Sequence, residues 1–182
     1  GALDSLAQAV TQSSRSTKTV RIETRKLGYL TWKHRYISDR YPYSYLKISD
    51  GCDRGCTYCA IPGMRGRFRS RPMESILNEA EFLATNGKKE MILVSQEATL
   101  WGYDLPGRPS LVDLLEQLAA IRDIVWIRPM YLYPAQLDEG TIDYLGSGSK
   151  TLPYFDLPLQ HINSDVLKRM HRQIDRPRIE SL

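Results

Sequence analysis

Apolar positions in the stretch from residue 41 to residue 95 follow two different periods. The segments 43–49 (YSYLKIS) and 90–95 (EMILVS) have the length of strands, and the second is apolar enough to be buried on both faces of a sheet. Between them, apolar residues recur every three or four positions, as on one face of a helix. These residues are Ile76, Leu77, Ala80, Leu83 and Ala84. Pro72 suits the first turn of this helix, and the Asn86-Gly87 pair suits its end.

The same alternation continues to the end of the chain. It predicts helices at 111–121 and 135–145, strands at 124–130 and 152–159, and a further helix that begins at 165–170. Four strand-then-helix units in succession are typical of an α/β fold that has a parallel sheet with right-handed crossovers. Periodicity does not distinguish an open doubly wound sheet from a barrel. No closing strand follows the last helix, so we expect a fragment of a larger domain.

Residues 1–40 lack this regularity. A short helical piece at 2–10 is followed by the polar stretch 11–18 (TQSSRSTK), which has the composition of a linker. The mixed basic and aromatic residues at 20–36 suggest a strand or an arm over a neighbour. We therefore interpret 1–40 as a linker or tail from a missing N-terminal domain, and 41–182 as a partial core domain.

Composition restricts the classes of protein that fit. The chain has 182 residues, of which 42% are hydrophobic and 25% are charged, as in a soluble protein with one sizeable core. No apolar run approaches the roughly 20 residues that span a bilayer, and residues 1–10 lack the pattern of a signal peptide. We therefore expect a cytoplasmic protein that does not associate with membranes.

The net charge of +4 is distributed unevenly along the chain. Arg65, Arg67, Arg69 and Arg71 occupy every second position, so they would line one face of an extended segment. Such a stripe favours contact with nucleic acid or with a ribonucleoprotein surface. The alternatives are a solvated edge, or ion pairs with the acidic helix that follows.

The three cysteines carry the strongest chemical signal. Cys52, Cys56 and Cys59 lie within eight residues, in the loop after the first predicted strand. Disulfide frameworks use an even number of cysteines, whereas thiols grouped this tightly indicate a metal site in a reducing compartment. The spacing Cys-x-x-x-Cys-x-x-Cys allows three thiolates to bind three corners of a 4Fe-4S cluster and leaves the fourth iron open. Gly51 and Gly55 would let the backbone bend closely around the cluster.

Two other metal sites compete with this interpretation. A structural zinc ion needs four ligands, and the fourth would have to be His161, at the end of a distant strand. Together with the arginine stripe, such a site would make the chain a zinc-stabilised nucleic-acid-binding module. A ferredoxin-type cluster needs a fourth cysteine, which the sequence lacks. The cluster with an open iron agrees best with the ligand count.

The cysteine loop and its flanks also resemble a known family. A cysteine motif of this spacing after a first strand is similar to the defining motif of the radical S-adenosylmethionine (SAM) superfamily. The stretch YSYLKISDGCDRGCTYCAIPGMRGRFRSRP resembles the methylthiotransferases, as do ILVSQEATLWGYDL, WIRPMYLYP and YFDLPLQH at later strand ends. The similarity covers about residues 41–172. It is greatest to the branch that methylthiolates an aspartate of a small-subunit ribosomal protein, and the tRNA-modifying branch is the alternative.

This resemblance implies a fold, cofactors and an activity. The fold would be a partial (β/α) barrel of the radical SAM type, truncated at the C-terminus, with about four of its six βα units present. The open iron would bind the amino and carboxylate groups of SAM, and an electron from the cluster would cleave SAM to a 5′-deoxyadenosyl radical. The implied partners are an electron donor and a ribosomal protein or the ribosome. Family members also have a second cluster and a C-terminal β-barrel domain, so we expect this chain alone at most to bind and cleave SAM.

The resemblance further assigns roles to four residues near the first two strands. Tyr58 precedes the third cysteine, where the family has an aromatic residue beside the adenine of SAM. Ser95, Gln96 and Glu97 end the second predicted strand, where the family holds the amino group of SAM. The alternative role for Glu97 is to cap a helix.

Candidate residues also follow the third and fourth predicted strands. Arg128 closes the third strand, where it would meet the carboxylate of SAM or, alternatively, pair with Asp156. Gln160 and His161 follow the fourth strand and are expected at the same mouth, with a structural role as the alternative for the histidine. We interpret the aromatic cluster 131–134 (YLYP) as core packing beneath a turn, and the alternative is that it shapes a substrate pocket.

Overall fold

The computed structural model describes residues 35–38 and 40–182, and the elements expected within residues 1–34 lie outside these ranges. Its centre is a parallel sheet of three strands in the order β1-β4-β5. The strands are β1 (Tyr43–Lys47), β4 (Glu90–Val94) and β5 (Trp126–Pro129). The first three predicted strands are therefore confirmed, and β4 and β5 each pair with the parallel strand that precedes them in the sheet.

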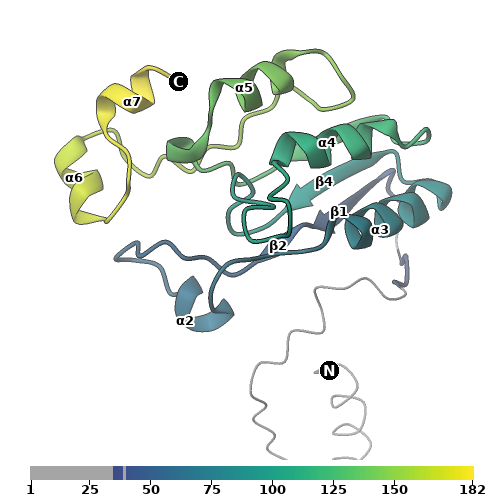
Figure 1. The fold of residues 1–182 in the computed structure, drawn as a ribbon, viewed down its shortest axis with the longest axis horizontal. Helices are drawn as coiled ribbons and strands as arrows, with labels where there is room; N and C mark the ends of the chain where they lie inside the picture. Colours follow the sequence, from purple (N-terminus) through teal and green to yellow (C-terminus); the bar gives the residue numbers. More distant parts are fainter. Residues whose placement is uncertain (1–34, 39) are drawn as a thin grey trace, which may run out of the picture.

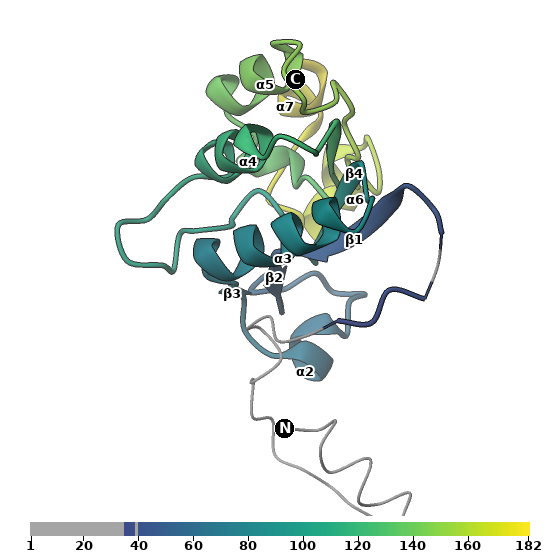
Figure 2. The same cartoon turned by 90° about the vertical axis from the view of Figure 1, so that its right-hand side faces the viewer.

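The two long helices lie side by side on one face of this sheet (Figure 1, Figure 2). α3 (Met73–Thr85) contacts β1, and α4 (Leu111–Ala120) contacts β5. A doubly wound sheet carries helices on both faces, whereas sequential parallel strands with helices on one side form the wall of a (β/α) barrel. The fold is therefore α/β, and its sheet is a segment of a barrel wall.

The hydrophobic core fills the space between the sheet and these helices. Met91 and Leu93 of β4 are fully buried there, together with apolar side chains of α3 and α4. Ile92 and Val94, which point to the opposite face, are only partly buried. The prediction that 90–95 is buried on both faces is therefore wrong, because among the described residues the helices cover one face of the sheet.

The predicted fourth strand at 152–159 does not form. One isolated bridge joins Thr151 to Ile127 of β5, and the Leu152 N–H donates to the carbonyl oxygen of Ile127 at 2.9 Å. Pro153 and Pro158 interrupt the segment. Proline has no N–H to donate to a neighbouring strand, so the chain follows β5 without building a ladder.

The first strand is shorter than the predicted range 43–49, and a pair of two-residue strands follows it. β1 ends at Lys47, and β2 (Ser49–Asp50) pairs with β3 (Arg69–Ser70) in antiparallel register. Between β2 and β3 lie the cysteines and the short helix α2 (Ile61–Arg65), which the sequence pattern did not predict. The segment between β2 and α2 runs past the C-terminal ends of the parallel strands (Figure 1), and its cysteines share a cavity with Gln96, which follows β4, and Tyr131, which follows β5.

Short helices form the C-terminal third of the described chain. They are η2 (Pro134–Gln136), α5 (Glu139–Gly146), α6 (Ser164–Arg169) and α7 (Arg176–Glu180). The helix expected at 135–145 begins later, because the Asp138 side chain accepts the Thr141 N–H at 2.7 Å and starts α5 there. None of the described helices has the length and apolar character needed to cross a bilayer.

Candidate active site

The cysteine loop (residues 51–59) brings its three thiols to one cavity of about 230 Å³. Cys52 is buried, Cys56 and Cys59 are partly buried, and none of the three forms a disulfide. The cavity lies at the C-terminal ends of the parallel strands, the end that carries the active site in (β/α) barrels. Its lining consists of Cys52, Arg54, Cys56, Tyr58, Cys59, Ile61, Gln96, Glu97, Tyr131, Tyr133, Pro158, Gln160 and Arg172.

Gly51 sets the direction in which the loop leaves β2. Its φ of +78° is in the left-handed region, and an added Cβ would lie 2.1 Å from the carbonyl oxygen of Arg67. Its N–H donates to Gln96 Oε1 at 2.9 Å. Gly55 has no positive φ and no atom within 4 Å of an added Cβ, so the expected tight approach of the backbone occurs at Gly51 and not at Gly55.

Asp53 connects the loop to the segment that returns to β3. Its Oδ1 accepts the Phe68 N–H at 3.1 Å, and its Oδ2 accepts the Tyr103 hydroxyl at 3.0 Å. Partial burial acts to raise the pKa of Asp53, but these hydrogen bonds and the charge of Arg67 outweigh it and lower the pKa below its usual value. The Asp53 carboxylate is therefore ionised at neutral pH and holds the loop from one side.

Arg54 connects the loop to the end of β4. Its Nε and Nη2 donate to the two oxygens of Glu97 at 2.8 and 2.7 Å, in a bidentate ion pair. The Glu97 carboxylate raises the pKa of Arg54 further above its usual value, and the guanidinium group lies 4.5 Å from the centre of the Tyr133 ring. The charge of Arg54 is thus compensated by Glu97 within the site.

The segment after α6 holds the loop from the other side. The Thr57 N–H donates to the Met170 carbonyl oxygen at 3.2 Å, and Arg54 Nη1 donates to Gln173 Oε1 at 2.6 Å. Arg172 Nη1 lies 3.8 Å from Cys56 Sγ, within hydrogen-bond reach of a sulfur acceptor. These contacts join residues more than a hundred positions apart in the sequence, so periodicity gave no indication of them.

The thiols themselves differ in their surroundings. Burial raises the pKa of Cys52 above its usual value, and the hydrogen bond from the Arg54 N–H to its sulfur, at 3.4 Å, opposes that shift. Cys56 has the buried guanidinium group of Arg172 as its neighbour. Burial of Cys52 opposes loss of its proton, and a metal bound to the sulfur would displace that proton. For Cys56, the nearby guanidinium group of Arg172 stabilises a thiolate.

Four of the residues predicted to bind SAM meet at this cavity. Tyr58, Gln96, Glu97 and Gln160 all line it. Ser95 lies next to it, in a neighbouring cavity of about 500 Å³ that shares Gln96, and its buried Oγ has no hydrogen-bond partner among the described residues. Glu97 does not cap a helix: it follows β4, and Arg54 engages both of its oxygens.

Two other candidates lie elsewhere. Arg128 Nε donates to Glu90 Oε1 at 2.7 Å, so the alternative pairing with Asp156 is wrong and the arginine does not line the cavity. His161 is exposed, and its Nδ1 accepts the Asn163 N–H at 2.9 Å in the turn before α6. Arg128 thus pairs with a residue of the adjacent strand, and His161 forms its hydrogen bond with a residue two positions further along the chain.

The aromatic cluster at 131–134 divides between the two roles considered for it, core packing and the lining of a cavity. Leu132 and Pro134 are buried, which agrees with core packing beneath a turn. Tyr131 and Tyr133 line the cavity, and Tyr131 is 46% exposed with a φ of +61°. Arg54 and Arg172 were not predicted as site residues, since their contacts depend on the fold.

The arginine stripe is not a single face. Arg71 is buried and pairs with Glu79 of α3, which confirms the alternative of ion pairs with the following helix. Arg69 is partly buried and donates to the Arg65 carbonyl oxygen at 3.1 Å. The regular two-residue alternation fails because β3 has only two residues, so the segment is not extended over its length. Arg65 and Arg67 are the members that remain exposed.

A single zinc ion fits the site poorly. No group of three or more His, Cys, Asp or Glu side chains in the described part of the chain is arranged to hold one metal ion. His161, the fourth ligand that zinc would require, does not line the cavity of the thiols. In a 4Fe-4S cluster each thiolate binds a different iron, so its three sulfurs lie farther apart than the ligands of one ion.

Comparison with known proteins identifies the class. Residues 46–182 match the Radical SAM superfamily, and the chain belongs to this superfamily. Its fold agrees with a radical S-adenosylmethionine methyltransferase, TsrM from Kitasatospora setae, with a TM-score of 0.58 at 18% identity over 76% of this chain and 27% of that chain. The chain is therefore part of an enzyme of the radical SAM class, which uses a 4Fe-4S cluster and SAM.

Within the class, the chain is similar to methylthiotransferases. It is 49% identical to "Ribosomal protein uS12 methylthiotransferase RimO" of Aquifex aeolicus (strain VF5), over 82% of this chain and 36% of that protein. It is 47% identical to the protein of the same name from Acetivibrio thermocellus, over 83% of this chain and 33% of that protein. The chain thus spans about a third of the length of the curated relatives that it matches.

Proposed function

We propose that the chain is the radical SAM core of a methylthiotransferase that modifies an aspartate of the small-subunit ribosomal protein S12. The observation that carries this proposal is the meeting of Cys52, Cys56 and Cys59 with Gln96 and Glu97 at one cavity. The similarity to the RimO proteins of two bacteria supports the ribosomal substrate over tRNA. A cytoplasmic location follows from a ribosomal substrate and from thiols that must stay reduced.

In this proposal, Cys52, Cys56 and Cys59 each bind one iron and leave the fourth open. When bound, the cluster supplies the electron that cleaves SAM to a 5′-deoxyadenosyl radical. Ser95, Gln96 and Glu97 follow β4 and would hold the amino group of SAM. Glu97 Oε1 accepts from Arg54 Nη2 and from the Thr99 hydroxyl, at 2.7 and 3.4 Å, whereas Oε2 accepts from Arg54 Nε and keeps a second lone pair for a donor such as this amino group.

The remaining lining residues shape the cavity. Tyr58 and Tyr131 give it aromatic walls with exposed ring surface that suits an adenine ring, whereas the Tyr133 ring is already engaged by Arg54 and Arg172. Gln160 adds an amide at the same wall. Arg128 is left out of this assignment, because Glu90 and the Tyr154 ring already engage its guanidinium group.

Two assays test the proposal at different depths. After anaerobic reconstitution with iron and sulfide and chemical reduction, the chain is expected to convert SAM to 5′-deoxyadenosine, measured by mass spectrometry. The full-length protein that contains this chain is then offered ribosomal protein S12 and tRNA together. A methylthio group on an aspartate of the protein is expected, and modification of the tRNA alone would refute the choice of substrate.

A further inference from the structure

Arg172 is a buried cation for which the described residues supply no acidic partner. Only 9% of its surface is exposed. Its Nη2 donates to the Pro158 carbonyl oxygen at 2.5 Å, and its guanidinium carbon lies 4.3 Å from the centre of the Tyr133 ring. Its buried Nε has no hydrogen-bond partner in the described part of the chain. A charge removed from water in this way is costly unless an anion lies close to it.

Arg54 and Arg172 lie over the same aromatic ring, but only Arg54 has a carboxylate partner among the described residues. Both guanidinium groups lie over the ring of Tyr133, at 4.5 and 4.3 Å. Arg54 has the bidentate partner Glu97, so that pair adds no net charge to the site. Among the described residues, Arg172 is therefore a buried positive charge beside the cysteine loop that no carboxylate compensates.

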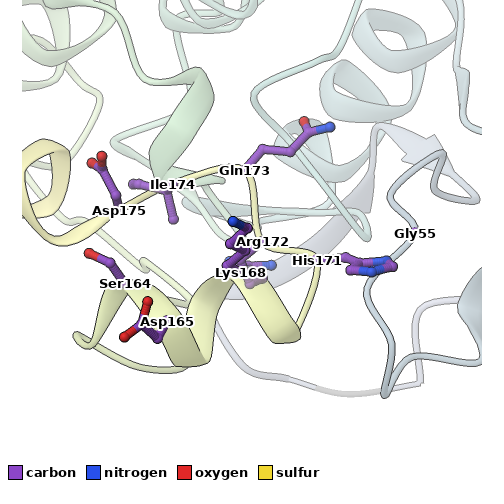
Figure 3. A pocket seen from close by; sticks show the side chains of 9 residues that line it. All are labelled: Gly55, Ser164, Asp165, Lys168, His171, Arg172, Gln173, Ile174 and Asp175. Atoms are coloured by element: carbon purple, nitrogen blue, oxygen red, sulfur yellow. The ribbon is translucent and has the colours of Figure 1, made fainter.

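Arg172 does reach the Cys56 thiol, a group that becomes an anion as an iron ligand: Cys56 Sγ lies 3.8 Å from Arg172 Nη1. The distance is fixed from both sides. Thr57 donates through its N–H to the carbonyl oxygen of Met170, and the Arg172 N–H donates to the carbonyl oxygen of Leu167 at 2.9 Å. Figure 3 shows Arg172 just beyond α6, in a second cavity of about 530 Å³ that Gly55 of the cysteine loop also lines.

We propose that Arg172 is a positioning residue that donates a hydrogen bond to the Cys56 thiolate and raises the reduction potential of the cluster. This inference rests on the proposed function, in which Cys56 is an iron ligand. Hydrogen bonds to the ligand sulfurs and the net charge around a cluster set its potential. Reduction adds one negative charge, so a fixed cation beside a ligand sulfur stabilises the reduced form more than the oxidised form.

The experiment is a redox titration of the reconstituted chain, followed by electron paramagnetic resonance. The chain has three cysteines and can hold one such cluster, so the signal has a single source. The variants are Arg172→Gln, Arg172→Lys and, as a matched control, Lys168→Gln. Lys168 lies on α6 and lines the second cavity, but its side chain is exposed and its charge is screened by solvent (Figure 3).

Arg172→Gln is expected to lower the ratio of reduced to oxidised cluster at a fixed solution potential roughly tenfold, which is about 59 mV for a one-electron couple. Arg172→Lys keeps the charge and is expected to stay close to the wild type, as is Lys168→Gln. Equal shifts in Arg172→Gln and Arg172→Lys would show that the shape of the side chain matters and its charge does not, which overturns the inference. An unchanged potential in Arg172→Gln overturns it as well.

The two proposals fail in distinguishable ways. A wild-type chain that takes up no cluster refutes the proposed function itself. A wild-type chain with a cluster whose potential does not respond to Arg172→Gln refutes the role of Arg172 alone. If Arg172→Gln does not load, the potential of Arg172→Lys decides: a value near the wild type supports the role of the charge, and failure of both to load contradicts it.

Discussion

The cysteine loop (residues 51–59) and the arginine segment (residues 65–71) follow each other in the chain, and regular spacing makes both conspicuous in the sequence. In the structure, the three thiols of the loop meet at one cavity. The four arginines separate: Arg71 is buried against Glu79, while Arg67 has 90% of its side chain exposed. The cysteine spacing therefore corresponds to one site, whereas the regularly spaced arginines do not form one surface.

The difference has a physical cause. A spacing of three and two residues between cysteines suits a curved loop, and contacts from three parts of the chain impose that curvature. They come from Gln96, the Phe68 N–H, Glu97 and Met170. An alternating stripe needs an extended strand, and β3 extends over two residues only. A motif that depends on local geometry is therefore reliable only if the backbone that it assumes actually forms.

The largest effect is expected for the thiols. Replacing Cys56 with alanine removes one of three ligands, and we expect the iron content after reconstitution to fall at least roughly tenfold. Iron and sulfide analysis together with the visible absorption spectrum measures this. Cys52→Ala and Cys59→Ala should behave alike, and full iron content in any one of the three would contradict a shared cluster.

The next effect concerns the buried end of the arginine segment. Arg71→Ala breaks an ion pair with Glu79 whose side chains are 5% and 9% exposed, and it also removes hydrogen bonds to Ser75 and to the Lys47 carbonyl oxygen. Glu79 keeps Arg35 as an ion-pair partner at 3.0 Å, so we expect a loss at the lower end of the range for broken buried pairs, about 3 kcal/mol in the free energy of unfolding. Denaturant unfolding measures the change, and a loss below about 1 kcal/mol would place Arg71 with the exposed surface pairs.

A smaller effect is expected at the point where the two regions touch. Gly51→Ala places a Cβ against the Arg67 carbonyl oxygen at a positive φ, and we expect a loss of about 1–3 kcal/mol in the free energy of unfolding. Gly55→Ala is the matched control in the same loop, since its Cβ would meet no atom within 4 Å. Equal losses in the two variants would contradict the tight approach at Gly51.

The smallest effect is expected for the exposed arginines. Arg67 approaches Asp53 Oδ1 at 3.5 Å through a largely solvated side chain, so Arg67→Ala should change stability by less than about 1 kcal/mol. If Arg65 and Arg67 contact RNA, the double alanine variant should weaken binding of a ribosomal RNA fragment and flatten its salt dependence. Binding that is unaffected at low salt would remove nucleic acid from the functions of this segment.

Much of the fold could be predicted from the sequence because its signals are local. The apolar period of 76–84 fixed α3, and the Ser110–Asp113 capping box started α4 at the expected residue. The expected strand at 152–159 failed because Pro153 and Pro158 outweigh its apolar content. Helix α2 contains Pro62 and Gly63 and has no buried face, so its sequence has no helical period of apolar residues from which to predict it.

The site divides in the same way. The meeting of the three thiols could be predicted because the cysteines share one short loop, and the meeting with Gln96 and Glu97 because strand ends of a barrel share one rim. The presence of Arg172 at the site could not be predicted from the sequence. Its contact with Cys56 spans 116 positions and depends on the turn after α6. Arg128 was misplaced at the rim because Glu90, which binds it, lies on the adjacent strand.

The most direct test of the central claim is electron paramagnetic resonance of the reduced, reconstituted chain with and without SAM. The account predicts a 4Fe-4S signal whose shape changes when SAM is added, because SAM would bind the iron that the three cysteines leave open. A signal that SAM does not alter would contradict the open iron. A colourless chain that binds zinc and takes up no iron would contradict the assignment of Cys52, Cys56 and Cys59 as cluster ligands.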